Sequence, residues 1–256
     1  MEYVVESMFA IAGKVAVIAG AAGGMGNEIS RAFGSLGVKL VLVDLNAERL
    51  QELELEIKRD NDVIAVPTDI TDKKSVQAMA GVVFDRFGRI DILINCAGLS
   101  YLEDAVDFDE DKWDQLMAVN VKGTFLTCQV VGRYMLQQKE GRIVNFSSVR
   151  GIQGRAKDMA YAPSKGAINQ LTKSLAIEWA QSGINVNALA PTYILTEMNR
   201  GMLEDRETFQ WVLGRIPKGR LGEPENIIGP LVFLCAPCSE FVTGQILYVD
   251  GGWTAA

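Results

Sequence analysis

The sequence predicts an α/β fold in which a doubly wound, parallel seven-stranded sheet carries helices on both faces. Short apolar runs rich in β-branched residues alternate with amphipathic stretches almost to the end of the chain. The runs are continuously apolar, which is typical of strands buried on both faces of a parallel sheet. The chain has 256 residues, enough to bury a full core, and no linker or repeat divides it. We therefore expect one domain over residues 1–256.

The apolar runs place the strands, and the amphipathic stretches between them place the helices. Strands are expected at Lys14–Ala19, Lys39–Asp44, Val63–Val66, Ile90–Asn95, Arg142–Phe146, Ile184–Leu189 and Ile246–Val249. Helices are expected at Gly24–Ser35, Ala47–Arg59, Lys73–Phe87, Lys112–Gln138, Tyr161–Gln181 and Pro224–Leu234. The least regular stretch, residues 192–221, is expected to form a lid over a substrate site, with an ordinary surface insertion as the alternative.

Composition and charge exclude several classes of function. The net charge of −7 argues against a nucleic-acid-binding surface, although a local basic patch could still bind a small anion. The chain has no histidine, which excludes Ser-His-Asp hydrolysis and histidine acid–base catalysis. No apolar run approaches the ~18 residues of a membrane span, and Glu2 and Glu6 stand where a secretory signal carries positive charge. We expect a cytoplasmic protein without membrane attachment.

The four cysteines include one C-x-x-C pair, Cys235 and Cys238. A zinc site usually needs a second such pair or histidine ligands, and the chain has neither. We therefore expect free, buried or partly buried thiols and no metal.

A glycine-rich turn follows the first strand and contains Gly20, Gly24, Met25 and Gly26. Glycines permit a tight turn and let the backbone approach a pyrophosphate, which the following helix N-terminus attracts. A glycine turn alone could be a plain corner. Because an apolar strand precedes this turn and a helix follows it, a Rossmann-type NAD(P)-binding site is favoured.

Asp44 ends the second strand and is followed by Leu45 and Asn46. A carboxylate at this position can accept hydrogen bonds from a ribose 2′-hydroxyl and would repel a 2′-phosphate. A helix cap or turn residue is the alternative. Since no arginine follows Asp44 directly, NAD is preferred over NADP.

Other candidate cofactor contacts follow later strands, because ligands of such sheets bind at the carboxyl ends of the strands. Asp69 could meet the adenine edge or cap the next helix. Asn95 could brace neighbouring strands, and the segment after it could be a plain turn. The candidates in these positions are Asp69, Ile70, Asn95, Ala97, Gly98 and Pro191.

Tyr161, Lys165 and Ser148 form the candidate catalytic set. A phenol has a reference pKa of ~10 and is a poor acid or base at neutral pH. Lys165 lies one helical turn after Tyr161, where its charge can stabilise the phenolate. A hydroxyl from Ser148, at a neighbouring strand end, could hold a substrate alcohol or carbonyl. Together with the nucleotide-binding turn, this set predicts hydride transfer.

In order and spacing these motifs resemble the short-chain dehydrogenase/reductase family, over essentially the whole chain after about residue 9. The matching positions are Gly20-x-x-x-Gly24-x-Gly26, Asn95-x-Ala97-Gly98, Asn120, Ser148, Tyr161-x-x-x-Lys165 and Pro191. The chain departs from the family pattern at Ala19, Cys96 and Thr192, where threonine, asparagine and glycine are usual. The loss of the threonine is expected to remove one local hydrogen bond, and Thr192 to alter the substrate entrance.

The resemblance implies roles for individual residues. Tyr161 would be the general acid–base, Lys165 would lower the pKa of Tyr161 and bind the ribose, and Ser148 would steady the reacting oxygen. Asn120, inside the long fourth helix, would hold a water that links Lys165 to solvent. The nicotinamide carboxamide would be contacted by Ile194 and Thr196.

Within the family the chain is most similar to gluconate 5-dehydrogenase and related sugar-acid and polyol dehydrogenases, chiefly through Gly154-Arg155. The expected substrate is a small molecule, a sugar acid or a polyol. Four basic residues, Arg150, Arg155, Lys157 and Arg200, flank the expected mouth near Ser148 and Tyr161, and could bind an anionic group or be solvated loop charges.

Two other functions remain open at this point. One is reduction of a 3-oxoacyl thioester, which the preference for NAD disfavours. The other is a non-catalytic nucleotide-binding scaffold or sensor, which the complete catalytic set disfavours. By resemblance the protein is also expected to be a homotetramer.

Overall fold

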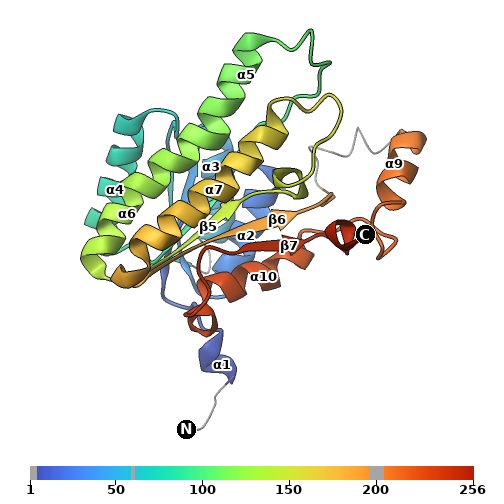
Figure 1. The fold of residues 1–256 in the computed structure, drawn as a ribbon. Helices are drawn as coiled ribbons and strands as arrows, with labels where there is room; N and C mark the ends of the chain where they lie inside the picture. The colour runs from blue at the N-terminus through green and yellow to red at the C-terminus, as the bar shows by residue number, and fades with distance from the viewer. Residues whose placement is uncertain (1–4, 59–60, 196–204) are drawn as a thin grey trace.

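The computed structural model describes residues 5–58, 61–195 and 205–256, and its elements follow the predicted order (Figure 1). The strands are β1 (Val15–Ala19), β2 (Lys39–Asp44), β3 (Val63–Pro67), β4 (Ile92–Asn95), β5 (Gly141–Phe146), β6 (Ile184–Pro191) and β7 (Ile246–Val249). The helices are α1 (Val5–Met8), α2 (Gly24–Ser35), α3 (Ala47–Ile57), α4 (Lys73–Phe87), α5 (Glu110–Met117), α6 (Thr124–Gln138), α7 (Tyr161–Trp179), α9 (Arg206–Leu213) and α10 (Glu225–Cys235).

All seven strands form one parallel sheet in the order β3-β2-β1-β4-β5-β6-β7, which confirms the predicted fold class. The order reverses between β1 and β4, where Ala19 lies beside Asn95. Ligands of open α/β sheets bind at such a switch point, beyond the carboxyl ends of the strands. The topology therefore fixes where the site must lie.

Two buried layers cover the two faces of the sheet. Ala16 and Ile18 point into one layer with α2, α3 and α10, whereas Val15 and Val17 point into the other with α4, α6 and α7. Successive residues of a strand point to opposite faces, so a strand must be apolar throughout to serve both layers. Figure 1 shows the same two groups of helices on either side of the sheet.

The fourth helix differs from the expectation of one continuous helix over Lys112–Gln138. It starts at Glu110, runs as α5, passes through a π-helical segment over Ala118–Gly123 and continues as α6. A π-helical turn inside an α-helix often marks a functional site. Here the segment contains Asn120, which is completely buried.

A small third cluster of buried side chains lies outside the two main layers. Val212 of α9 and Ile216 pack there with Val149 and Trp253. Helix α9 was missed in the irregular stretch 192–221, and Asp205 begins it by accepting a hydrogen bond from the Thr208 amide at 2.8 Å. This cluster ties the stretch and the C-terminal residues to the loop after β5.

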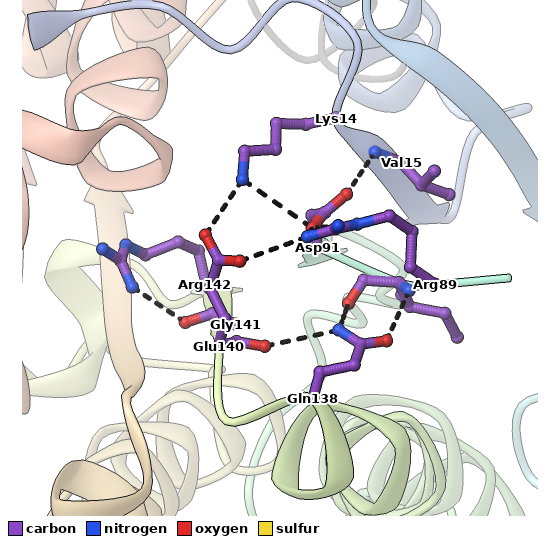
Figure 2. A network of polar contacts seen from close by, with 9 residues as sticks. Lys14, Val15, Arg89, Asp91, Gln138, Glu140, Gly141 and Arg142 are labelled. Atoms are coloured by element: carbon purple, nitrogen blue, oxygen red, sulfur yellow. Dashed lines mark hydrogen bonds and ion pairs between the residues drawn. The ribbon is translucent and has the colours of Figure 1, made fainter. Parts of the chain in front are cut away.

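A polar network braces the amino ends of the central strands (Figure 2). The Asp91 carboxylate is buried. It accepts hydrogen bonds from the Val15 amide and from Nε of Arg89, both at 2.8 Å. Lys14 and Arg89 both bridge onward to Glu140, at 2.9 and 3.1 Å. The network joins the starts of β1, β4 and β5, at the ends of the strands that lie opposite the switch point.

No helix in the described part of the chain is long and apolar enough to cross a membrane.

Asp91→Ala should lower the free energy of unfolding by about 3 kcal/mol, because it leaves the Val15 amide and the Arg89 guanidinium without their buried partner. Asp104→Ala is the matched control, since its ion pair with Lys157 is largely exposed and should contribute less than about 1 kcal/mol. Urea denaturation of both variants measures the difference. Equal losses would show that the network is no more than a surface feature.

Candidate active site

The ends of three strands are tied together at the switch point. The amides of Gly20 and Ala21 both donate to the Val43 carbonyl of β2, at 2.7 and 3.1 Å. The amides of Cys96 and Ala97 both donate to the Ala19 carbonyl of β1, at 2.9 Å each. The glycine turn is therefore held between β2 and the segment after β4.

Two glycines of this turn leave no room for a Cβ atom. Gly20 has a φ of +92°, and a Cβ there would lie 2.5 Å from the Ala97 nitrogen. A Cβ on Gly26 would lie 2.0 Å from the Gly20 carbonyl oxygen. The first turn of α2 thus rests directly on the loop, and its free amides face the switch point. This cradle fits a pyrophosphate, because the glycines let an anion approach the backbone amides at the start of α2.

Asp44 lies beside the turn, as the sequence predicts, and does not cap a helix. Its Oδ2 accepts the Ala22 amide and its Oδ1 accepts the Asn46 amide, both at 3.1 Å. Asn46 is the residue that caps α3, by accepting the Arg49 amide at 3.0 Å. Leu45 is 74% exposed. The carboxylate is therefore held next to the pyrophosphate cradle, where a ribose would lie.

Asp69 and Ile70 lie after β3, with Asp69 exposed. The Asp69 Oδ1 accepts the amide and the hydroxyl of Thr71, at 2.8 and 2.7 Å. Asp72 caps α4 instead, by accepting the amides of Lys74 and Ser75. The alternative that Asp69 caps the helix is therefore wrong.

The Asn95 side chain bonds internally, which matches its expected bracing of neighbouring strands. Its Nδ2 donates to Asn145 Oδ1 at 2.9 Å, and its Oδ1 accepts the Thr127 hydroxyl at 2.7 Å. Ala19 and Cys96, two positions at which the chain departs from the family pattern, contact each other beside Asn95. The Cys96 thiol donates a hydrogen bond to the Ala19 carbonyl at 3.0 Å. Burial raises the pKa of this thiol to about 12, so it is a structural group.

The remaining cofactor candidates lie at the ends of β6 and β7. Pro191 pairs with Val249 at the end of β6, and Ile194 is buried and bridges to Gly222. Thr196 lies outside the described residues. Residues Thr192 and Tyr193, from the same stretch, line the cavity described below.

The structure brings the catalytic candidates together at the carboxyl end of β5. Tyr161 is the first residue of α7, and its phenol lies close enough to the Ser148 side chain for the serine to lower the pKa of the phenol. Lys165 lies one turn further along, with Nζ 5.4 Å from the centre of the Tyr161 ring. Nζ donates to the Phe146 carbonyl at 2.7 Å, and the side chain is 4% exposed.

Asn120 closes the site from the π-helical segment. Its Oδ1 accepts the Leu99 amide at 2.8 Å, and its Nδ2 donates to the Leu99 carbonyl and the Ser164 hydroxyl at 3.0 and 3.1 Å. Gly98 lies between Asn120 and Lys165, since a Cβ there would lie 3.4 Å from Asn120 Oδ1 and 3.8 Å from Lys165 Nζ. The side chain thus locks the segment after β4 onto α7.

Burial dominates the titration of both catalytic groups. It raises the pKa of Tyr161 to about 12, against the lowering effect of the Ser148 hydrogen bond and of nearby Arg150. It lowers the pKa of Lys165 to about 8. The expectation that Lys165 lowers the pKa of the phenol therefore leaves out the largest influence on that pKa, which is the desolvation of Tyr161.

A clamp that the sequence analysis missed fixes the serine loop to the tyrosine helix. The Ser147 hydroxyl donates to Asn169 Oδ1 at 2.6 Å, and Asn169 Nδ2 donates to the Gly151 carbonyl at 3.3 Å. A Cβ on Gly151 would lie 2.5 Å from Asn169 Nδ2, so the contact is close. The signal in the sequence is the spacing of Asn169, four residues after Lys165 and on the same helical face.

The Ser148–Tyr161 pair opens on a cavity of about 320 Å³. Arg150, Arg155 and Asp158 line it together with Leu102, Val149 and Tyr193. Arg155 donates to the Tyr193 hydroxyl at 2.9 Å. Of the four basic residues predicted to flank a substrate, Arg150 and Arg155 border the cavity, Lys157 pairs with Asp104 instead, and Arg200 lies outside the described residues. Asp158, which the sequence analysis did not single out, is buried there and accepts the Ala162 amide of α7 at 3.2 Å.

Gly26→Ala should abolish binding of nicotinamide dinucleotides and lower the free energy of unfolding by about 2 kcal/mol, because the new methyl group collides with backbone rather than with a movable side chain. Gly229→Ala in α10 is the control, since a Cβ there meets nothing within 4 Å. Fluorescence titration with NADH and urea denaturation measure both effects. Retained NADH affinity in Gly26→Ala would contradict the assignment of the cradle.

Known proteins resemble the chain over its whole length. A family model described as enoyl-(acyl carrier protein) reductase matches residues 20–254. A galactitol 2-dehydrogenase (L-tagatose-forming) from Cereibacter sphaeroides is 40% identical over 99% of each chain, and a 5-keto-D-gluconate 5-reductase from Escherichia coli is 36% identical over 98% of this chain and 99% of the relative.

A solved structure agrees with these relatives. The gluconate 5-dehydrogenase from Burkholderia cenocepacia, in complex with NADP and tartrate, superposes with a TM-score of 0.93 at 35% identity, covering 98% of each chain. With the parallel sheet, the glycine turn and the Ser148–Tyr161–Lys165 arrangement, these matches show that the chain belongs to the short-chain dehydrogenase/reductase family.

Proposed function

We propose that the protein interconverts a secondary alcohol and a ketone on a sugar acid or polyol, with NAD as the preferred cofactor. One observation supports this most strongly: the neighbouring hydroxyls of Ser148 and Tyr161 open on a cavity lined by Arg150, Arg155 and Asp158. A hydroxyl pair can bind one reacting oxygen, while charged walls suit a polyhydroxy chain or an acid.

In this mechanism Tyr161 gives its proton to the carbonyl oxygen during reduction and takes it from the alcohol during oxidation. Ser148 donates a hydrogen bond to the same oxygen as negative charge develops on it. Lys165 places a positive charge behind the phenol at neutral pH, because burial lowers its pKa only to about 8 and its Nζ is held by the Phe146 carbonyl. The nicotinamide supplies or accepts the hydride.

The cofactor would lie across the switch point. The cradle of Gly20, Gly24, Met25 and Gly26 would take the pyrophosphate, and the predicted contacts from β2, β3, β4 and β6 would surround the rest. These contacts are Asp44, Leu45, Asp69, Ile70, Asn95, Ala97, Gly98, Pro191, Ile194 and Thr196.

The choice between NAD and NADP depends on Asp44. Its carboxylate is fixed by the amides of Ala22 and Asn46, so it cannot swing away from an incoming 2′-phosphate without losing both bonds. The Burkholderia relative is described with NADP. We therefore propose NAD as the preferred cofactor and NADP as the weaker one, and the assay below includes both.

Reduction of an acyl thioester is the second candidate, because the matching family model is described as an acyl carrier protein reductase. The charged cavity wall disfavours it, since a fatty acyl chain would leave three ionisable side chains against apolar surface. A non-catalytic scaffold is disfavoured because Ser148, Tyr161 and Lys165 lie together and Asn120 is bonded to Ser164 on the same helix as Tyr161 and Lys165.

We also propose that the protein forms a homotetramer and that residues 192–221 cover the cavity. The exposed apolar side chains of Phe125 on α6 and Ile177 on α7, 40% and 82% exposed, support association into a homotetramer. Thr192 and Tyr193 border the cavity, which supports a covering role for residues 192–221.

Tyr161→Phe should lower kcat by at least about 10³-fold while the Kd for NADH changes less than about 3-fold, because only the transferable proton is lost. Tyr134→Phe is the control, as this half-buried tyrosine of α6 packs on Phe84, away from the cavity. Nicotinamide absorbance with sugar acids, polyols and secondary alcohols, each with NAD and then NADP, measures turnover. Undiminished activity in Tyr161→Phe would contradict the mechanism.

A further inference from the structure

Arg150 is a buried arginine without a carboxylate partner. It lies two residues after Ser148, lines the cavity and is 7% exposed. Within the described residues, no ion pair joins its guanidinium to an acidic side chain. Buried arginines are rare unless they are paired, because removing the charge from water is unfavourable. Its presence here therefore needs a physical reason.

The contacts of Arg150 provide hydrogen-bond acceptors for only part of its guanidinium group. Nη1 donates to the Gly154 carbonyl at 3.3 Å, and the guanidinium carbon lies 5.5 Å from the centre of the Trp253 ring. Nη2 is buried and has no hydrogen-bond partner among the described residues. A stack on an aromatic ring orients a guanidinium without neutralising it. One charged donor, Nη2, is therefore left without an acceptor on a side chain that lines the cavity.

The neighbouring charged side chains already have interaction partners. Arg155 donates to the Tyr193 hydroxyl at 2.9 Å, and the exposed Arg215 stacks on Trp211 at 4.6 Å. The buried Asp158 carboxylate accepts the Ala162 amide at 3.2 Å, at the start of the tyrosine helix. Arg150 alone thus combines a position next to the reacting hydroxyls, burial and an unused donor.

We propose that Arg150 determines substrate specificity by binding an anionic oxygen group, a carboxylate or phosphate, on a polyhydroxy substrate. The inference rests on the proposed function and narrows it, because with a neutral polyol the two arginines would share Asp158 as their nearby carboxylate and one positive charge would stay uncompensated. An anion on the chain of the bound alcohol supplies both the counter-charge and an acceptor for Nη2. Arg155, from the other side of the cavity, adds a second positive charge.

The test compares three six-carbon polyhydroxy substrates that carry a carboxylate, no charged group or a phosphate ester: D-gluconate, D-glucitol and D-glucitol 6-phosphate. The wild type should prefer an anionic substrate. Arg150→Gln should raise KM for that substrate by about 10- to 100-fold with a smaller change in kcat, which is the effect of losing a charge-assisted contact. The ratio of kcat/KM between the anionic substrate and glucitol should fall by the same factor.

Two variants separate charge from structure. Arg133→Gln removes one positive charge from the exposed face of α6 and should leave the ratio unchanged. Arg150→Lys keeps the charge but loses the planar fork, and should restore part of the preference. A preference for gluconate identifies a carboxylate as the recognised group, and a preference for the phosphate identifies a phosphate ester.

A binding measurement makes the inference independent of turnover. In the Tyr161→Phe background with NAD bound, calorimetry should detect binding of the anionic compounds, and adding Arg150→Gln should remove it. Binding or kcat/KM that falls equally for charged and neutral compounds, or a wild-type preference for glucitol, would overturn the role of Arg150. Failure of the wild type to oxidise any of the three while it still binds the anion through Arg150 would instead contradict the proposed function.

Discussion

The site depends on one buried hydrogen bond, from the Lys165 ammonium to the Phe146 carbonyl at 2.7 Å. It joins the last residue of β5 to the second turn of α7, so it sets the distance between the Ser148 loop and the Tyr161 helix. It also keeps a charge in a place from which water is excluded, which lowers the pKa of Lys165 to about 8. A charge in such surroundings acts strongly on a phenol beside it.

Hydrogen bonds of amide and hydroxyl side chains, rather than ion pairs, hold the structure around this bond in place. The π-helical segment turns Asn120 toward Leu99 and Ser164, and the Asn169 clamp holds the loop that carries Ser148. The Asn120–Leu99 and Ser147–Asn169 contacts join segments after strand ends to helices, and the Asn120–Ser164 contact joins two helical segments. At the amino ends of the strands the buried Asp91 is instead held by cations.

The order of strands and helices could be predicted from the sequence, because a strand that serves two cores must be apolar along its length. The proximity of Ser148, Tyr161 and Lys165 could be predicted because they occupy fixed spacings at a strand end and on one helix face. The π-helical segment, helix α9 and the Asn169 clamp could not, since they depend on contacts between segments far apart in the chain. Sequence likewise gives charge but not burial, which is why the titration of Tyr161 and the unpartnered Nη2 of Arg150 emerge only from the structure.

The central claim is that Tyr161 transfers the proton from a buried position and that Ser148 moderates its pKa. The most direct measurement is the pH dependence of kcat/KM for alcohol oxidation in the wild type and in Ser148→Ala. Oxidation needs the phenolate, so the rate should rise toward alkaline pH, and loss of the serine should move that rise to higher pH because the Ser148 bond lowers the pKa of Tyr161. A rise at the same pH in both proteins would contradict the claim.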